Sequence, residues 1–145
     1  MKHNYLKHLF TALLLLCTTF ASAHDFEVGG IYYNILSEED KTVEVTYKGS
    51  SNSEYSNEYT GSVVIPESIT HNDVSYSVIS IGELAFYDCS GLTSVVIPNS
   101  VTSIGNNAFR ECTALASVII GNGIVGIGDY AFAYCSDLAS IEIPN

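Results

Sequence analysis

The sequence predicts an α/β solenoid, in which short strand-and-helix units stack into a parallel β-sheet on one side and a layer of short helices on the other. Two observations predict this class. A unit of 23 residues recurs without gaps along the second half of the chain. Each copy holds a β-prone run followed by apolar residues at helical spacing. Such a unit is too short to bury its own apolar face, so stability requires that the copies stack.

The repeat is clearest where residues 95–117 align with residues 118–140. An earlier copy stands another 23 residues upstream, and the last copy is incomplete. The matched positions are Ile81, Ile104 and Ile127, each followed by glycine; Phe86, Phe109 and Phe132, each preceded by alanine; Cys89, Cys112 and Cys135; and Leu92, Leu115 and Leu138.

Each copy divides into a strand, a bend and a helix. The β-branched residues between Leu92 and Pro98 favour a strand, and Pro98 ends it because proline has no N–H to donate. Asn99 or its equivalent then supplies a turn. From residue 105 to residue 115 the apolar positions recur every three or four residues, which predicts a helix of two or three turns.

Stacking should place equivalent residues in columns about 4.8 Å apart. We therefore expect Phe86, Phe109 and Phe132 to form an internal aromatic column. The three repeated cysteines would lie close enough for a disulfide, but equivalent side chains point the same way. We interpret them as free buried thiols, with a disulfide as the alternative.

The pattern from Ile81 to Ser103, Ile-Gly-x-x-Ala-Phe-x-x-Cys-x-x-Leu-x-Ser-Val-x-Ile-Pro-x-Ser-Val-Thr-Ser, resembles the BspA-like branch of leucine-rich repeats. The resemblance covers residues 62–145. Ser100 and Gly123 stand where commoner leucine-rich repeats carry Asn or Cys, which fits this branch. The resemblance implies a parallel β-sheet on the concave side and short helices on the convex side. It also implies a secreted or cell-surface protein of bacteria that acts as an adhesin toward host proteins or other cells.

Three regions are expected along the chain. Residues 1–23 read as a signal peptide cleaved after Ala23, since a basic start, an apolar run and small residues follow in order. Lipid attachment at Cys17 is the alternative, and the bulky Leu16 before it argues against it. We expect a secreted, extracellular or cell-surface protein without a transmembrane span.

Residues 24–61 are expected to form an N-terminal β-hairpin cap and a polar loop. The hairpin would join residues 31–36 to residues 42–48. Residues 62–145 are then the leucine-rich repeats, of which the first copy carries a 9-residue insertion. That insertion, around Asn72 and Asp73, reads as a second small hairpin.

Nothing in the pattern indicates catalysis or a cofactor. Behind the predicted cleavage site only His24 and His71 could act as a base, and neither lies in a catalytic or zinc motif. The acidic run Glu38 to Asp40 reads as a solvated turn, with weak calcium binding as the alternative. The net charge of −11 opposes nucleic acid and anionic membranes. We expect no enzyme, no cofactor and no metal.

The predicted strands expose every second side chain, and this defines the candidate ligand-binding face. An apolar column on the open face of a protein predicts recognition, although β-propensity alone would also place such residues there. The expected partner is an extracellular or host protein or a glycan. The alternative is a structural spacer or a self-assembling matrix component, with weak self-association through an uncapped C-terminal repeat. The candidate residues are Ser94, Val96, Ser117, Ile119, Ser140 and Glu142.

Overall fold

The computed structural model describes residues 24–49 and 58–144. Within these residues the regular secondary structure consists of ten strands in two sheets. The predicted signal peptide, most of the predicted polar loop and Asn145 lie outside the described residues.

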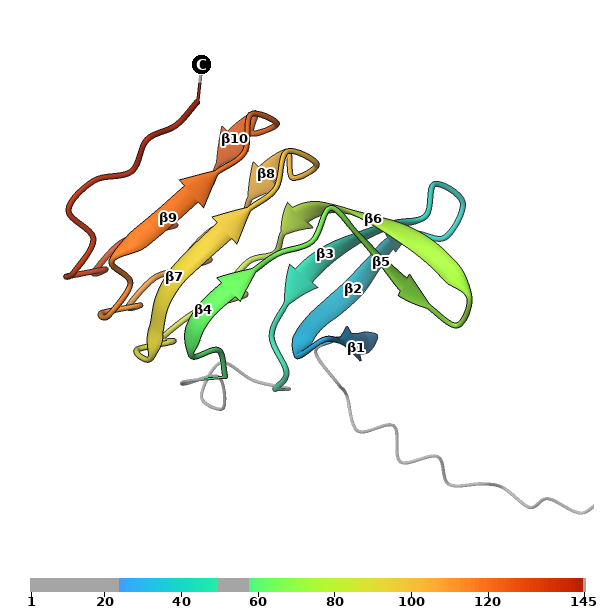
Figure 1. Ribbon diagram of the computed structural model, residues 1–145, viewed down its shortest axis with the longest axis horizontal. Helices are drawn as coiled ribbons and strands as arrows, with labels where there is room; N and C mark the ends of the chain where they lie inside the picture. The colour runs from blue at the N-terminus through green and yellow to red at the C-terminus, as the bar shows by residue number, and fades with distance from the viewer. Residues whose placement is uncertain (1–23, 50–57, 145) are drawn as a thin grey trace, which may run out of the picture.

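The first sheet is the parallel sheet that the repeat predicts. It consists of β4 (Gly61–Val64), β7 (Leu92–Ile97) and β9 (Ser117–Ile120), which lie side by side in Figure 1. Equivalent residues face one another across it: Val96 lies opposite Val64 on one side and Ile119 on the other. The alignment of the repeat copies therefore sets the register of the sheet, with the 9-residue insertion taken up between β4 and β7.

A second sheet lies on another side of the solenoid, in which each repeat copy forms one coil. Its order is β1 (Phe26–Val28), β2 (Ile31–Ser37), β3 (Thr42–Thr46), β6 (Val74–Ile81), β8 (Ser103–Ile104) and β10 (Gly126–Ile127), with β5 (Ser68–His71) paired to β6. The strands β6, β8 and β10 pair in parallel. The sequence predicts the hairpins of this sheet but not its continuation through β8 and β10, because two-residue strands leave no periodic signal.

Both predicted hairpins are present. Strands β2 and β3 pair antiparallel, and β3 then pairs in parallel with β6, so the first hairpin continues the second sheet. Strands β5 and β6 form the second hairpin, with Asn72 and Asp73 at its tip. Both tip residues have positive φ angles, 48° and 61°, as the tight turn between two paired strands requires.

The predicted helices are wrong: the described residues contain none. Residues 105–115 form consecutive turns, in which Asn107 and Glu111 have positive φ angles of 55° and 65°. The amides of Asn107, Phe109 and Glu111 donate to carbonyl oxygens of the next coil at 2.9, 2.7 and 2.9 Å. Because every second N–H points along the solenoid, the bonds of an α-helix cannot form. A turn every three or four residues produces the same apolar spacing as a helix.

The predicted aromatic column runs through the core. The ring centroids of Phe86 and Phe109 are 4.7 Å apart and those of Phe109 and Phe132 are 5.0 Å apart, with interplanar angles of 8° and 2°. Tyr59 continues the column, with its ring 4.5 Å from that of Phe86. Its hydroxyl donates to the carbonyl of Thr46 at 2.7 Å. The column therefore extends from the repeats to the hairpin of β2 and β3.

The glycine after each repeated isoleucine is required by close packing of the coils. A Cβ atom on Gly105 would lie 2.6 Å from the backbone nitrogen of Glu83, and one on Gly128 would lie 2.6 Å from that of Asn106. No side chain fits at these distances unless the coils separate. The close and regular distance between neighbouring coils therefore depends on these glycines.

The three repeated cysteines are free and buried, as expected. The thiol of Cys112 donates to the carbonyl of Phe86 at 2.9 Å, and that of Cys135 donates to the carbonyl of Phe109 at 3.1 Å. These two thiols thus point at backbone carbonyl groups of the preceding coil. Each weakly polar S–H group therefore has an acceptor inside a column that is closed to solvent.

Candidate binding face

The outward side of the three-stranded sheet carries an apolar column in register. Val64 and Ile119 are 64% and 59% exposed, and Val96 between them is partly exposed. Leu92, Val95 and Ile97 of the same strand are buried on the inner side. The structure therefore brings Val96 and Ile119 together on one open surface, to which Val64 adds a third member.

A parallel column of serines lies beside the apolar one. Ser94 pairs with Ser62 and with Ser117 in the register of the sheet. The hydroxyl of Ser94 donates to that of Ser62 at 2.7 Å. The face thus combines apolar side chains with hydroxyl groups that can donate to or accept from a ligand.

No strand forms around Ser140 and Glu142, so these two candidate residues do not extend the two columns by pairing. Residues 139–144 carry no strand, and β9 pairs only with β7 in the described part of the chain. The propensity of Ile141 and Ile143 for a strand is not sufficient by itself. A segment pairs as a strand only where the neighbouring strand lies in the correct register along the length of the segment.

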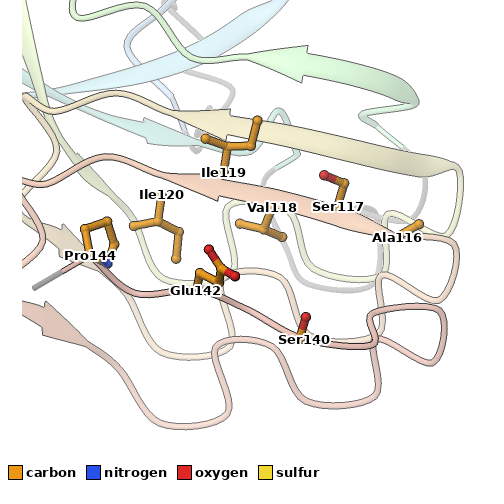
Figure 2. A pocket seen from close by; sticks show the side chains of 8 residues that line it. All are labelled: Ala116, Ser117, Val118, Ile119, Ile120, Ser140, Glu142 and Pro144. Carbon is orange, nitrogen blue, oxygen red and sulfur yellow. The ribbon is translucent and has the colours of Figure 1, made fainter.

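A pocket of about 360 Å³ separates this last segment from β9. Figure 2 shows Ser117 and Ile119 on β9, with Ser140, Glu142 and Pro144 on the opposite wall. Both inward and outward side chains of β9 line it, so the pocket follows the unpaired edge of the strand. The two candidate residues that leave the sheet therefore remain beside the binding face, across this slot.

The residues weighed for chemistry lie apart from one another. His71 ends β5, where its ring stacks on that of Phe26 with centroids 4.1 Å apart. The Nδ1 atom of His24 donates a hydrogen bond to the Lys48 carbonyl oxygen, 3.1 Å away. In the acidic turn, Lys41 lies 3.5 Å from Glu38. Across residues 24–49 and 58–144, no group of three or more metal-binding side chains is suitably placed for an ion.

One exposed aromatic group escaped the sequence analysis. Tyr130 and Tyr134 are 69% and 68% exposed and have positive φ angles of 57° and 61°. The guanidinium of Arg110 lies 5.4 Å from the ring of Tyr134 and pairs with Glu111 at 3.2 Å. The repeat pattern did not mark these rings, because the aligned positions of the preceding copy carry Asn107 and Glu111.

Stacked coils with an in-register parallel sheet define a class of repeat protein, and comparison with known sequences gives the family. The BspA type leucine rich repeat region matches residues 51–145 in 6 copies. The chain therefore belongs to the BspA-type leucine-rich repeat family. A search of curated proteins gives no match.

Solved structures of bacterial leucine-rich repeat proteins share the fold. A leucine-rich repeat protein from Bacteroides ovatus is 35% identical with a TM-score of 0.72, over 83% of this chain and 30% of that one. One from Bacteroides capillosus is 32% identical with a TM-score of 0.68, over 86% of this chain and 83% of that one.

A leucine rich cell surface protein from Faecalibacterium prausnitzii is 34% identical with a TM-score of 0.63, over 80% of this chain and 29% of that one. The chain thus spans less than a third of the Bacteroides ovatus and Faecalibacterium prausnitzii chains.

In the part of the chain that the structure describes, no helix has the length and apolar character needed to cross a membrane.

Proposed function

We propose that this chain is a non-catalytic, cell-surface or secreted recognition module that binds an extracellular protein or glycan, in the manner of an adhesin. The binding surface is the outward face of β4, β7 and β9. The observation that carries the proposal is the in-register column Val64, Val96 and Ile119, which places three apolar side chains on an open face.

Two considerations support this function. Contiguous apolar side chains on a protein surface cost free energy in water, and such patches commonly mark interaction sites. The Faecalibacterium prausnitzii relative is described as a cell surface protein, and a signal peptide at residues 1–23 would bring this chain to the same place. A surface location is where an adhesin-like face would meet its partner.

The size of the face predicts weak or multivalent binding. Three strands about 4.8 Å apart, each exposing about 10 Å of length, offer on the order of 150 Å². A standard protein interface buries about 800 Å² on each partner. A single copy should therefore bind with micromolar affinity or weaker, and the pocket beside β9 with Ser140 and Glu142 would add contacts at one end. Display of several copies would raise the apparent affinity.

The test replaces Val96 and Ile119 together by aspartate. Both are surface residues of the sheet, so the double variant should stay folded while it loses binding to arrays of extracellular proteins and oligosaccharides. Val125→Asp is the matched control, because Val125 is 89% exposed and lies outside this sheet. Retained binding by the double variant, or equal loss in the Val125 variant, would contradict the proposal.

The structural alternative, a spacer that assembles with itself, gives a different result in the same samples. The unpaired edge of β9 is the feature that favours it, since an open strand edge can pair with another chain. Concentration-dependent sedimentation of the wild type, unchanged in the Val96 and Ile119 double variant, would support assembly in place of ligand recognition.

A further inference from the structure

A groove lies at the β4 end of the three-stranded sheet, between the turn that joins β1 to β2 and the outer edge of β4. Its larger cavity, of about 490 Å³, is lined mainly by Val28, Ile31, Tyr33, Val64, Pro66 and Ile69. A second cavity of about 280 Å³ shares Gly29, Ile31 and Val64 with the first. The volumes fall in or near the range of about 300–1,000 Å³ that is typical of ligand pockets.

Tyr33, one of the residues that line the larger cavity, carries an unsatisfied polar group. The Tyr33 side chain is fully buried, yet its hydroxyl has no hydrogen-bond partner. A buried hydroxyl without a partner is costly, and most such groups in proteins are paired. Ser68 and Thr70 also line the wall, but their side chains are exposed to solvent. The Tyr33 hydroxyl is the buried, unpaired group among the wall residues, and it is available to a polar atom of a bound molecule.

The edge of β4 offers main-chain groups beside the cavity. The amides of Gly61 and Ile65 donate toward β7, to Gly91 and Val96. Because successive residues of a strand point their N–H and C=O groups to opposite sides, those of Ser62 and Val64 point to the opposite edge. No strand in the described part of the chain pairs there, and Ser62 and Val64 both line the groove.

We propose that this groove binds an extended peptide, which adds as a further strand to the free edge of β4 and inserts one tyrosine-like side chain into the larger cavity. The apolar wall receives the ring of that side chain, and its polar tip pairs with the Tyr33 hydroxyl. Strand addition supplies affinity through main-chain bonds, and the cavity supplies specificity. This site adjoins the outward face of the sheet and shares Val64 with it. It uses the free edge of β4 and the cavity, so it does not depend on the proposed adhesin function.

Charge restricts the peptide further. The chain has a net charge of −11, and Glu58 stands at the second cavity. The carboxylate of Glu58 accepts hydrogen bonds from the amides of Lys48 and Gly49 at 2.8 and 3.1 Å, which fix its position at the groove. An acidic peptide would be repelled, and the occupant is neutral or basic.

The experiment uses the full chain and an acetylated, amidated probe peptide, Thr-Val-Thr-Tyr-Thr-Val-Thr, with a second probe that carries Phe in place of Tyr. Binding is followed by amide chemical shifts in NMR spectra. We expect the amides of Ser62 and Val64 to shift on titration, and the Tyr probe to bind about fivefold more tightly than the Phe probe. In Tyr33→Phe this preference should disappear. Tyr134→Phe, at an exposed tyrosine outside the groove, should keep it.

Two N-methylated versions of the Tyr probe test the strand addition without altering the protein. Methyl groups on the amides that face β4 should abolish binding, whereas methyl groups on the alternate amides should leave it intact. The proposal is overturned if no peptide shifts Ser62 and Val64 at about 1 mM, or if both methylated probes bind equally. It is also overturned if Tyr33→Phe keeps the preference for Tyr, or if dilution of the chain alone shifts these amides, since a second copy would then occupy the edge.

Discussion

The replacement of Phe109 by alanine tests how the stack is held together. Phe109 is fully buried and its ring stacks between two others, at 4.7 and 5.0 Å. Loss of a buried phenylalanine costs about 3–5 kcal/mol through lost transfer free energy and the cavity that remains. Because two ring contacts are lost together, we expect the free energy of unfolding of this variant to fall by about 4–5 kcal/mol. That is a large part of the roughly 5–15 kcal/mol that stabilises a domain.

Phe132→Ala provides the comparison, since Phe132 is only partly buried and the described structure gives its ring one stacked neighbour, Phe109. We expect about half the loss for this variant. Urea unfolding followed by circular dichroism measures both values. The reasoning is refuted if Phe109→Ala costs less than about 1.5 kcal/mol or no more than Phe132→Ala, because Phe109 would then not stand inside a packed column.

Two other variants follow from the structure. Gly105→Ala should destabilise the chain by about 1–3 kcal/mol in the same urea assay, because the added Cβ would lie 2.6 Å from the backbone nitrogen of Glu83. An unchanged midpoint of urea unfolding would show that neighbouring coils can move apart without cost. Burial raises the pKa of Tyr33 to about 12 from its ordinary value of 10.0, so the unfolded chain loses this proton first. Stability should therefore be fully present below pH 10 and fall as the pH rises toward about 12. Tyr33→Phe should weaken that fall in pH-dependent melting curves and, by removing an unpaired buried hydroxyl, raise stability at neutral pH by about 1 kcal/mol. Identical pH-dependent melting curves for the wild type and Tyr33→Phe would contradict this account.

The fold could be predicted from sequence wherever the 23-residue period acts on many positions together. The register of Val64, Val96 and Ile119 and the column of Phe86 and Phe109 follow directly, because stacking copies must place like residues side by side. The helices could not be predicted correctly. Apolar spacing of three or four residues does not reveal whether an amide bonds within its own coil or to the next one.

The binding face could be predicted only in part. Val96 and Ile119 lie where strand alternation predicts, but Ser140 and Glu142 lie across a pocket, since a β-prone sequence does not guarantee pairing. Tyr33 and the free edge of β4 carry no signal in the sequence. An unpaired hydroxyl and an unpaired strand edge become visible only when the surrounding contacts are known.

Methyl-to-methyl nuclear Overhauser effects on the exposed face test the central claim most directly, because that face depends on equivalent residues lying in file. Strands about 4.8 Å apart predict contacts from Val96 to both Val64 and Ile119, and none between Val64 and Ile119, which are separated by two strand spacings. A Val96 methyl group in contact with only one of them, or with neither, would contradict both the stacked register and the proposed binding face.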